Sequence, residues 1–222
     1  MSLKHWTGTA YQDVELGHAD KALTWDGTDY VQVWPVGSPI EYIGDQYATT
    51  TTVTIPTHQA GDLIIAHSVS GSASAGPTIP TGWTQTHRGT YSALAYRIAS
   101  APGTTSGTWT GAAYVAVFVF RGASAIGNYA ISTLQTGTTI TFPAITITNP
   151  GQSWAMRGFE GNQSRSVTSG PSSQPSQQLW TGTSPGFAWI SDGPVTDNIP
   201  TATTTISGTT AAVSMTWEVL PA

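Results

Sequence analysis

The chain has 222 residues, of which 39% are hydrophobic and only 9% are charged, and its formal net charge is −5. This length and apolar content allow one sizeable β domain, or a main domain with a small appendage, to bury a core. Because charge is so scarce, Thr, Ser, Gly and Gln must supply most of the surface, and the acidic balance argues against nucleic-acid binding, which needs a basic stripe.

Several other classes are disfavoured by what the sequence lacks. There is no Cys, so neither a disulfide framework nor a thiolate site can form. The first residues, Met-Ser-Leu-Lys, run straight into polar sequence, unlike a signal peptide. The longest apolar run, residues 112–120, has about half the length of a membrane helix. We therefore expect no membrane insertion, and assembly in the cytoplasm.

Two short units of similar sequence open the chain. The stretch HWTGTAYQDV begins at His5, and TWDGTDYVQV follows nineteen residues later. The second unit contains Asp26-Gly27, a strong signal for a tight turn between two strands. Each unit predicts a hairpin, which is too small to be stable alone in water. Its aromatic residues must therefore close on each other, on the rest of the chain or on another chain.

The rest of the chain predicts a linker followed by a β body. Two prolines flank a Val-Gly-Ser stretch at residues 35–39, so residues 36–47 are predicted to link an N-terminal segment, residues 1–35, to a body of residues 48–222. Polar and apolar residues alternate in short segments of the body, with almost no helical periodicity. Strands are predicted at residues 49–55, 63–70, 84–88, 92–99, 112–120, 138–142, 145–148, 153–159, 178–180, 187–191 and 213–219. We predict an all-β fold, an antiparallel β-sandwich of jelly-roll type.

Two segments of the body stand out from this pattern. Residues 112–120 are apolar on both faces, whereas the outer face of a sandwich strand normally meets water. Either an extra layer of this chain or a neighbouring subunit must cover the second face. Residues 164–177 are polar and of low complexity, and we predict a long exposed loop there.

No pattern in the sequence specifies catalysis. The carboxylates of the body lie in turns, at the end of a predicted strand or on an outward face, and they are Asp62, Glu160, Asp192, Asp197 and Glu218. Acid/base catalysis would need two of them in one cleft. His67 shares a strand face with Leu63 and Ile65, which predicts a core histidine rather than a ligand. We predict no catalytic residue, no cofactor and no metal site.

One binding signal remains near the end of the chain. Trp180, Phe187 and Trp189 lie among small polar residues, as in a surface that stacks aromatic rings on the C–H faces of a sugar. The alternative is that these rings fill the core of a chain that is poor in Leu. Both interpretations stay open at the level of sequence.

The opening repeat, with its Trp-x-Gly-Thr-x-Tyr core leading into Val-Trp-Pro at residues 33–35, resembles the N-terminal segments of minor tail proteins from phages of mycobacteria and related actinobacteria. Four pieces of the body resemble a β-sandwich module that recurs in phage structural proteins. They are Gly61-Asp62-Leu63-Ile64, Pro80-Thr81-Gly82-Trp83-Thr84, Ala95-Tyr96-Arg97-Ile98-Ala99 and Phe120-Arg121-Gly122. Together the resemblance covers about residues 4–35 and 49–122.

The resemblance implies a non-enzymatic virion protein that is assembled in the host cytoplasm. We expect a minor tail protein that contacts other virion proteins, forms a homo-oligomer, preferably a trimer, and presents its body for assembly or host contact. The residues expected to dock on the particle are the N-terminal aromatics Trp6, Tyr11, Trp25, Tyr30 and Trp34. Two alternatives remain: a capsid decoration protein, and a carbohydrate-binding module that recognises host cell-wall glycan through Trp180, Phe187 and Trp189.

Overall fold

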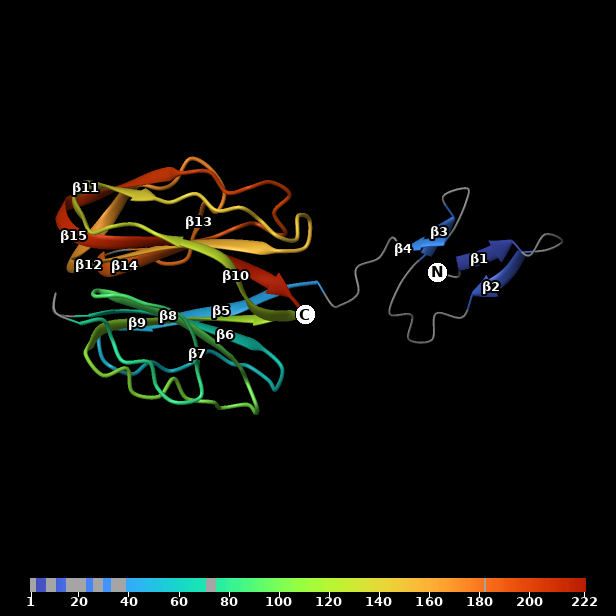
Figure 1. Cartoon of the computed structure of the whole chain (residues 1–222), viewed down its shortest axis with the longest axis horizontal. Helices are drawn as coiled ribbons and strands as arrows, with labels where there is room; N and C mark the ends of the chain where they lie inside the picture. Colours follow the sequence, from blue (N-terminus) through green and yellow to red (C-terminus); the bar gives the residue numbers. More distant parts are fainter. Residues whose placement is uncertain are drawn as a thin grey trace. The chain divides into compact units, whose positions relative to one another are not determined.

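The structure is a computed structural model that describes residues 39–70, 75–181 and 183–222, together with four short strands within residues 1–38 (Figure 1). The chain divides into two compact units, Met1–Ser38 and Pro39–Ala222. The boundary lies three residues beyond the end of the predicted N-terminal segment. All described elements are strands, all strand pairs are antiparallel, and no described helix could span a membrane.

The first unit contains the two predicted hairpins. Strand β1 (Leu3–Trp6) pairs with β2 (Tyr11–Val14), and β3 (Leu23–Trp25) pairs with β4 (Tyr30–Gln32). Each hairpin forms a two-stranded sheet of its own. The prediction of two hairpins is therefore confirmed.

The second unit is the body. Its strands are β5 (Glu41–Ala48), β6 (Leu63–Ser70), β7 (Thr84–Arg88), β8 (Ser92–Ile98), β9 (Ala112–Arg121), β10 (Ala123–Ile131), β11 (Gln135–Phe142), β12 (Trp154–Ser169), β13 (Gln177–Gln178), β14 (Thr183–Ile190) and β15 (Ala202–Pro221). They form two antiparallel sheets. The first has the order β5-β9-β6-β8-β7, and the second has the order β10-β15-β12-β14-β13, with β11 also pairing with β15.

The chain completes the first sheet before it begins the second. The crossing is made at a single residue, Gly122, which separates β9 from β10. Its φ of +66° lies in the left-handed region that glycine adopts without a Cβ penalty. A glycine at this corner lets the chain leave one sheet and enter the other at once.

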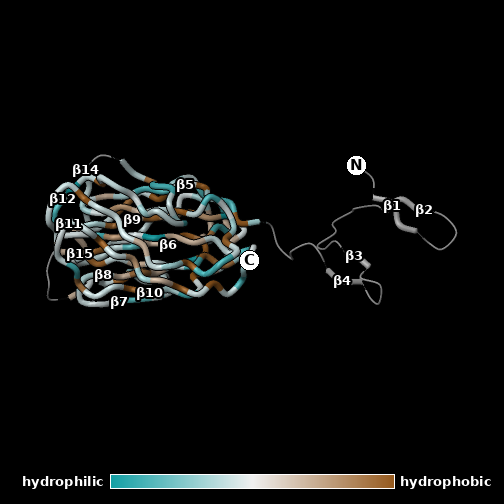
Figure 2. Tube along the Cα trace, turned by 90° about the horizontal axis from the view of Figure 1, so that it is seen from above, coloured by the Kyte–Doolittle hydropathy of each residue, from teal (hydrophilic) through white to brown (hydrophobic). Residues whose placement is uncertain are grey.

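The two sheets pack face to face (Figure 1). Leu63, Phe118 and Phe120 of the first sheet belong to the same buried cluster as Met156 and Trp217 of the second. Figure 2 shows hydrophobic stretches in strands throughout the body. Burial of these large side chains, at about 25 cal/mol per Å² of apolar surface, is the main force that holds the sheets together.

The second apolar face of β9 is covered by loops of the same chain. Its residues Val115, Val117 and Val119 are fully buried, and they cluster with Trp109 and with Val53 and Ile55. Trp109 precedes β9, and the two aliphatic residues lie in the segment between β5 and β6. Of the two explanations that the sequence left open, the extra layer within the chain is correct.

Four predicted segments need correction. The predicted linker, residues 36–47, contains most of β5, which pairs with β9 along its length. Residues 49–55 form no strand: they run as a loop that buries its apolar side chains against the first sheet. Residues 145–148 make only an isolated bridge, between Ile145 and Ile199. The predicted loop of residues 164–177 begins too early, because β12 continues to Ser169 and pairs there with β15.

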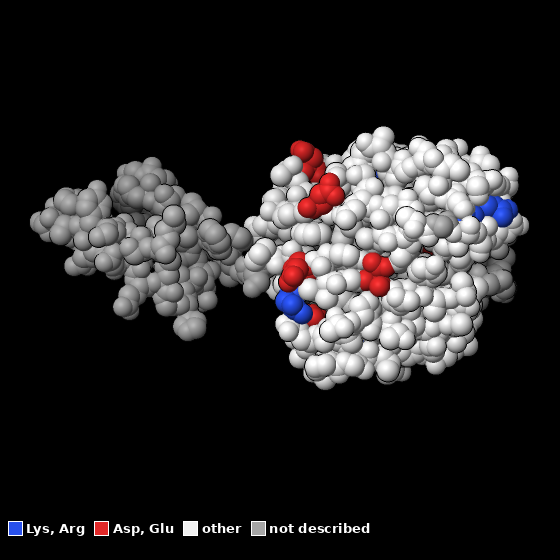
Figure 3. All heavy atoms as spheres, turned by 180° about the vertical axis from the view of Figure 1, so that it is seen from behind, with Lys and Arg blue, Asp and Glu red and all other residues white. Residues whose placement is uncertain are grey.

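The surface of the body carries few charges. Figure 3 shows one face on which uncharged residues cover nearly the whole surface and only a few acidic and basic groups are visible. This agrees with the composition, in which charged residues make up 9% of the chain.

Candidate functional site

The repeat in the first unit is also a repeat of strand register. In the first hairpin Trp6 pairs directly with Tyr11, and in the second Trp25 pairs directly with Tyr30. Directly opposed residues are the closest neighbours across an antiparallel pair. The structure thus brings four of the five predicted docking residues into two equivalent Trp–Tyr pairs, while Trp34 lies outside the described residues.

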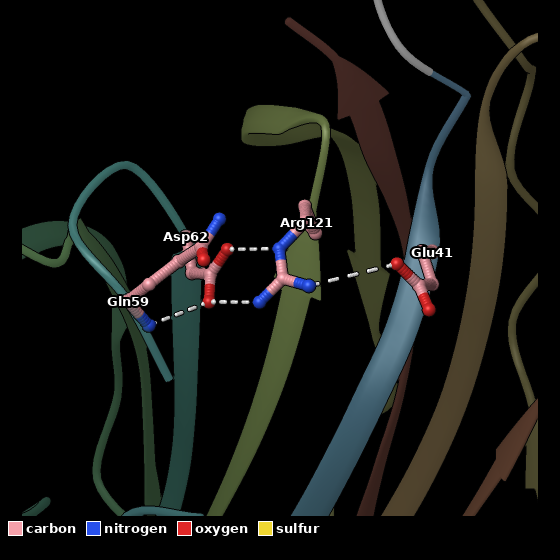
Figure 4. Close-up of polar contacts among 4 residues, drawn as sticks. All are labelled: Glu41, Gln59, Asp62 and Arg121. Carbon is pink, nitrogen blue, oxygen red and sulfur yellow. Dashed lines mark hydrogen bonds and ion pairs between the residues drawn. The ribbon is translucent and has the colours of Figure 1, made fainter. Parts of the chain in front are cut away.

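Four sequence pieces that the sequence analysis singled out, residues 61–64, 80–84, 95–99 and 120–122, lie in or beside the first sheet. Arg121 at the end of β9 holds Asp62, which immediately precedes β6, through two contacts: Nε to Oδ1 at 3.1 Å and Nη2 to Oδ2 at 3.2 Å (Figure 4). Oδ2 of the same carboxylate also accepts the backbone N–H of Gln59, at 2.9 Å. On the other side of Arg121, its Nη1 lies 3.8 Å from Oε2 of Glu41 on β5. Asp62 therefore ties the end of β9 and the start of β6 to the turn that precedes β6.

The other two pieces form a second link. The Arg97 guanidinium lies over the Trp83 ring, 4.5 Å from its centroid, a cation–π contact between the turn before β7 and β8. Ala99, the last residue of the third piece, donates its N–H to the Asp62 carbonyl at 2.8 Å. The motifs therefore link the strands and turns of this sheet to one another.

Changing Asp62 to Asn is expected to lower the free energy of unfolding, because Asp62 is buried and the change removes the charge that binds Arg121. Glu41→Gln is the matched control. The Glu41 side chain is 64% exposed and lies 3.8 Å from Arg121, so solvent screens their attraction. Its loss should therefore change the free energy of unfolding only slightly. Urea unfolding of both variants checks the order. Equal losses would show that the Asp62–Arg121 pair does not hold the strand ends.

The predicted sugar platform is wrong for two of its three residues. Phe187 and Trp189 lie on the face of β14 that points away from the other sheet, but β11 covers that face. Their side chains are 1% and 0% exposed, and they cluster with Ile140 and Phe142 of β11. Rings buried in this way cannot stack on a sugar. The small polar residues around them suggested exposure, but a local pattern could not show that β11 lies over them.

Trp180 is only partly buried, and it connects the two sheets at their open edge. Its ring stacks on Phe118 of β9, with 5.6 Å between centroids, and its Nε1 donates to the Asp45 carboxylate on β5. Asp45 also accepts the Tyr42 hydroxyl. The side chain thus joins the segment after β13 to the edge strand of the first sheet.

A histidine–glutamate pair that the sequence did not reveal lies between the sheets. His67 on β6 and Glu160 on β12 are 2% and 3% exposed, and 3.0 Å separates Nδ1 of the histidine from Oε1 of the carboxylate. The Trp217 ring lies beside His67, with centroids 5.9 Å apart. The predicted core position of His67 is confirmed, whereas the prediction that Glu160 ends a strand is wrong. Buried polar side chains need such a partner because each loses its hydration.

The carboxylate of Glu160 is enclosed on its other sides as well. A Cβ at Gly186, its partner on β14, would lie 2.8 Å from Glu160 Cγ and 3.1 Å from Tyr114 Cε1, so only glycine fits there. Burial raises the pKa of Glu160 above its ordinary value of 4.5, although the contacts with His67 oppose the shift. Burial, followed by the charge of Glu160, raises the pKa of Tyr114 well above its ordinary value.

Glu218 shows the opposite behaviour. It lies on the outward face of β15, as predicted, but it is fully buried because residues 128 and 148–149 close over it. Burial alone would raise its pKa, but hydrogen bonds from Ser153, Thr148 and Asn128 outweigh that effect and hold the pKa below 4.5. The Glu218 carboxylate therefore accepts hydrogen bonds from the backbone N–H groups of the segments that cover it.

The remaining carboxylates do not converge with these. Asp192 and Asp197 line a hollow of about 420 Å³ formed by residues 191–200 and Gln174. Asp192 accepts from the Gln174 amide at 2.8 Å, and Asp197 accepts from the Thr196 hydroxyl at 3.1 Å. Glu160 does not line this hollow. Among the described residues there is no group of three His, Cys, Asp or Glu side chains placed to hold a metal ion.

Comparison of the chain with protein-family models, with curated proteins and with solved structures gave no match.

Proposed function

We propose that this protein is a non-enzymatic structural component of a phage virion, a minor tail protein that attaches through its N-terminal unit and presents the β body for assembly or host contact. The observation that carries the proposal is the duplicated hairpin, with its equivalent Trp–Tyr pairs, ahead of a separate β unit. Aromatic residues are the usual anchors of protein interfaces.

The composition of the body supports the same role. Its surface is rich in neutral hydroxyl and amide groups and poor in charge, which suits packing against many neighbouring proteins. The carboxylates and histidine that could support acid/base chemistry either hold the fold together or lie apart. The localisation that we propose is the virion, with the tail preferred over the head.

Full-length protein carrying both Trp6→Ala and Trp25→Ala is expected to be depleted from purified particles by about tenfold or more, the size of effect that follows loss of interface anchors. Leu134→Ala is the control, because it removes an exposed hydrophobic side chain from the body instead. Quantitative mass spectrometry of particles measures both. A chain without residues 1–35 should behave like the double variant, and normal incorporation of either would refute the proposal.

Copy number separates tail from head. A few to a few dozen copies per particle would support the minor tail assignment, and hundreds of copies would favour a capsid decoration protein. The same mass spectrometry provides the number.

The homotrimer rests on the resemblance alone, because the loops of the chain itself cover the doubly apolar strand that favoured an oligomer. Light scattering of the purified protein gives the mass directly. The body that we propose is a β-sandwich without jelly-roll winding. A jelly roll winds two Greek keys through both sheets, whereas this chain builds each sheet from one continuous half of the body.

A further inference from the structure

The two N-terminal hairpins repeat one arrangement at their loop ends. In the first hairpin the directly opposed pair nearest the loop is Trp6–Tyr11, and in the second it is Trp25–Tyr30. Four residues lie between the members of each pair, and Gly and Thr are the second and third of the four in both hairpins. The loop ends are therefore matched in aromatic pair, in loop length and in loop sequence.

The other ends of the hairpins do not match in this way. Lys4 pairs with Asp13 in the first hairpin, whereas Leu23, at the equivalent position of the second, pairs with Gln32. A pair of ionisable residues in one hairpin is thus a neutral pair in the other. Identity is high where the strands meet the loop and low away from it, so the loop end is the surface that the chain presents twice.

The size of the hairpins indicates that both are needed for attachment. The first spans residues 3–14 and the second residues 23–32, and each forms a two-stranded sheet of its own. A stable protein interface uses roughly 20–30 residues on each side. One hairpin falls well short of that number, and only the two together reach it.

The separation of the two pairs along the chain limits how far apart their binding sites can lie. Trp25 follows Tyr11 by fourteen residues. An extended chain spans at most about 3.6 Å per residue, so the pairs can reach sites no more than about 50 Å apart. A small protein domain is about 30 Å across. Two copies of one protein that lie side by side therefore present the same surface twice within this reach.

We propose that the two hairpins bind equivalent sites on two neighbouring copies of one virion protein, so that each chain attaches bivalently. This inference rests on the proposed docking role of the N-terminal unit, and it identifies the kind of partner: an assembly in which one surface recurs within about 50 Å. Linking two weak sites in one chain makes the second binding event intramolecular, which raises the overall affinity by about 10²- to 10⁴-fold.

Single variants test whether both hairpins are engaged. Full-length Trp6→Ala and Trp25→Ala chains are each produced with an equal amount of the natural chain, and mass spectrometry of purified particles gives the ratio. Each variant should be incorporated at least about tenfold less than the natural chain, and the two ratios should agree within about threefold, because either change removes the same avidity. Leu134→Ala, on the body, should compete equally. If either single tryptophan variant competed equally, one hairpin would suffice and bivalent attachment would be overturned.

Exchange of the hairpins tests whether the two sites are the same. One chain carries the sequence of residues 5–14 at both places, and a second carries that of residues 24–33 at both. The exchanged segments are equal in length, and each is a hairpin sequence of the natural chain. Both chains should be incorporated within about threefold of the natural chain, because equivalent sites accept either hairpin. Depletion of either chain by about tenfold would overturn the inference.

The outcomes separate this inference from the proposed function. Normal incorporation of the chain with both Trp6→Ala and Trp25→Ala would refute the docking role itself. Depletion of that double variant together with depletion of an exchanged chain would leave the docking role in place and refute only the equivalence of the two sites.

Discussion

Replacing Glu160 by Ala is expected to lower the free energy of unfolding by about 3–5 kcal/mol, because it leaves the buried His67 ring without its partner and empties the space of a buried side chain. His67 would be left between the sheets without its carboxylate, and its other ring nitrogen, Nε2, already has no hydrogen-bond partner among the described residues. The change also opens a cavity beside Gly186. Urea unfolding followed by tryptophan fluorescence measures the loss.

A double-mutant cycle tests whether the pair itself causes this loss. His67→Ala should also be strongly destabilising, and the double variant should lose clearly less than the sum of the two single losses, because the second change removes a group that is already unpaired. Additive losses would show that the two side chains act independently.

The pH dependence gives the same pair a second readout. Folding raises the pKa of Glu160, so the stability that its protonated form contributes is fully present below about pH 4.5 and is lost as pH rises through the folded-state value. Glu160→Gln keeps the shape of the protonated side chain and cannot titrate. The unfolding free energy of the natural protein, relative to that of Glu160→Gln, should therefore fall as pH increases above 4.5. A difference that rises with pH would contradict the raised pKa.

Much of the fold could be read from local pattern. Period-two alternation located β8 and the C-terminal half of β15, a continuous apolar run located β9, and Asp26-Gly27 with its flanking residues indicated the β3–β4 hairpin. These features depend on neighbours in the sequence. The misread segments depend on partners that are distant in it. Residues 49–55 alternate as a strand would, yet they run as a loop that buries Val53 and Ile55 against the first sheet.

The polar groups of the core were harder to predict for the same reason. Glu160 precedes Gly161, which suggested the end of a strand, but β12 continues through that glycine to Ser169. Met156, Gly158 and Glu160 alternate along one face, so extending the period from buried Met156 would have placed the carboxylate inside. No local pattern, however, indicates that its partner is His67, which lies ninety-three residues earlier in the chain.

Trp109→Ala is expected to cost about 3–5 kcal/mol, because it empties the space of a fully buried indole. Trp109 packs edge-on against Trp83, with 5.3 Å between centroids, and belongs to the cluster that covers Val115 and Val117. Its loss should loosen the loop layer over the first sheet and expose the valine face of β9. Urea unfolding gives the energy, and binding of a hydrophobic dye reports the exposed face.

The same variant tests whether this layer replaces a subunit contact. With the valine face uncovered, Trp109→Ala should associate in a concentration-dependent way that the natural protein does not show through this face, because large exposed apolar patches favour association. Trp83→Ala is the control: its ring is only partly buried, so the layer should stay closed and the loss should be smaller. If Trp109→Ala lost less than about 1 kcal/mol, the indole would not hold the cover in place, and a neighbouring molecule would again be needed to explain why both faces of β9 are apolar.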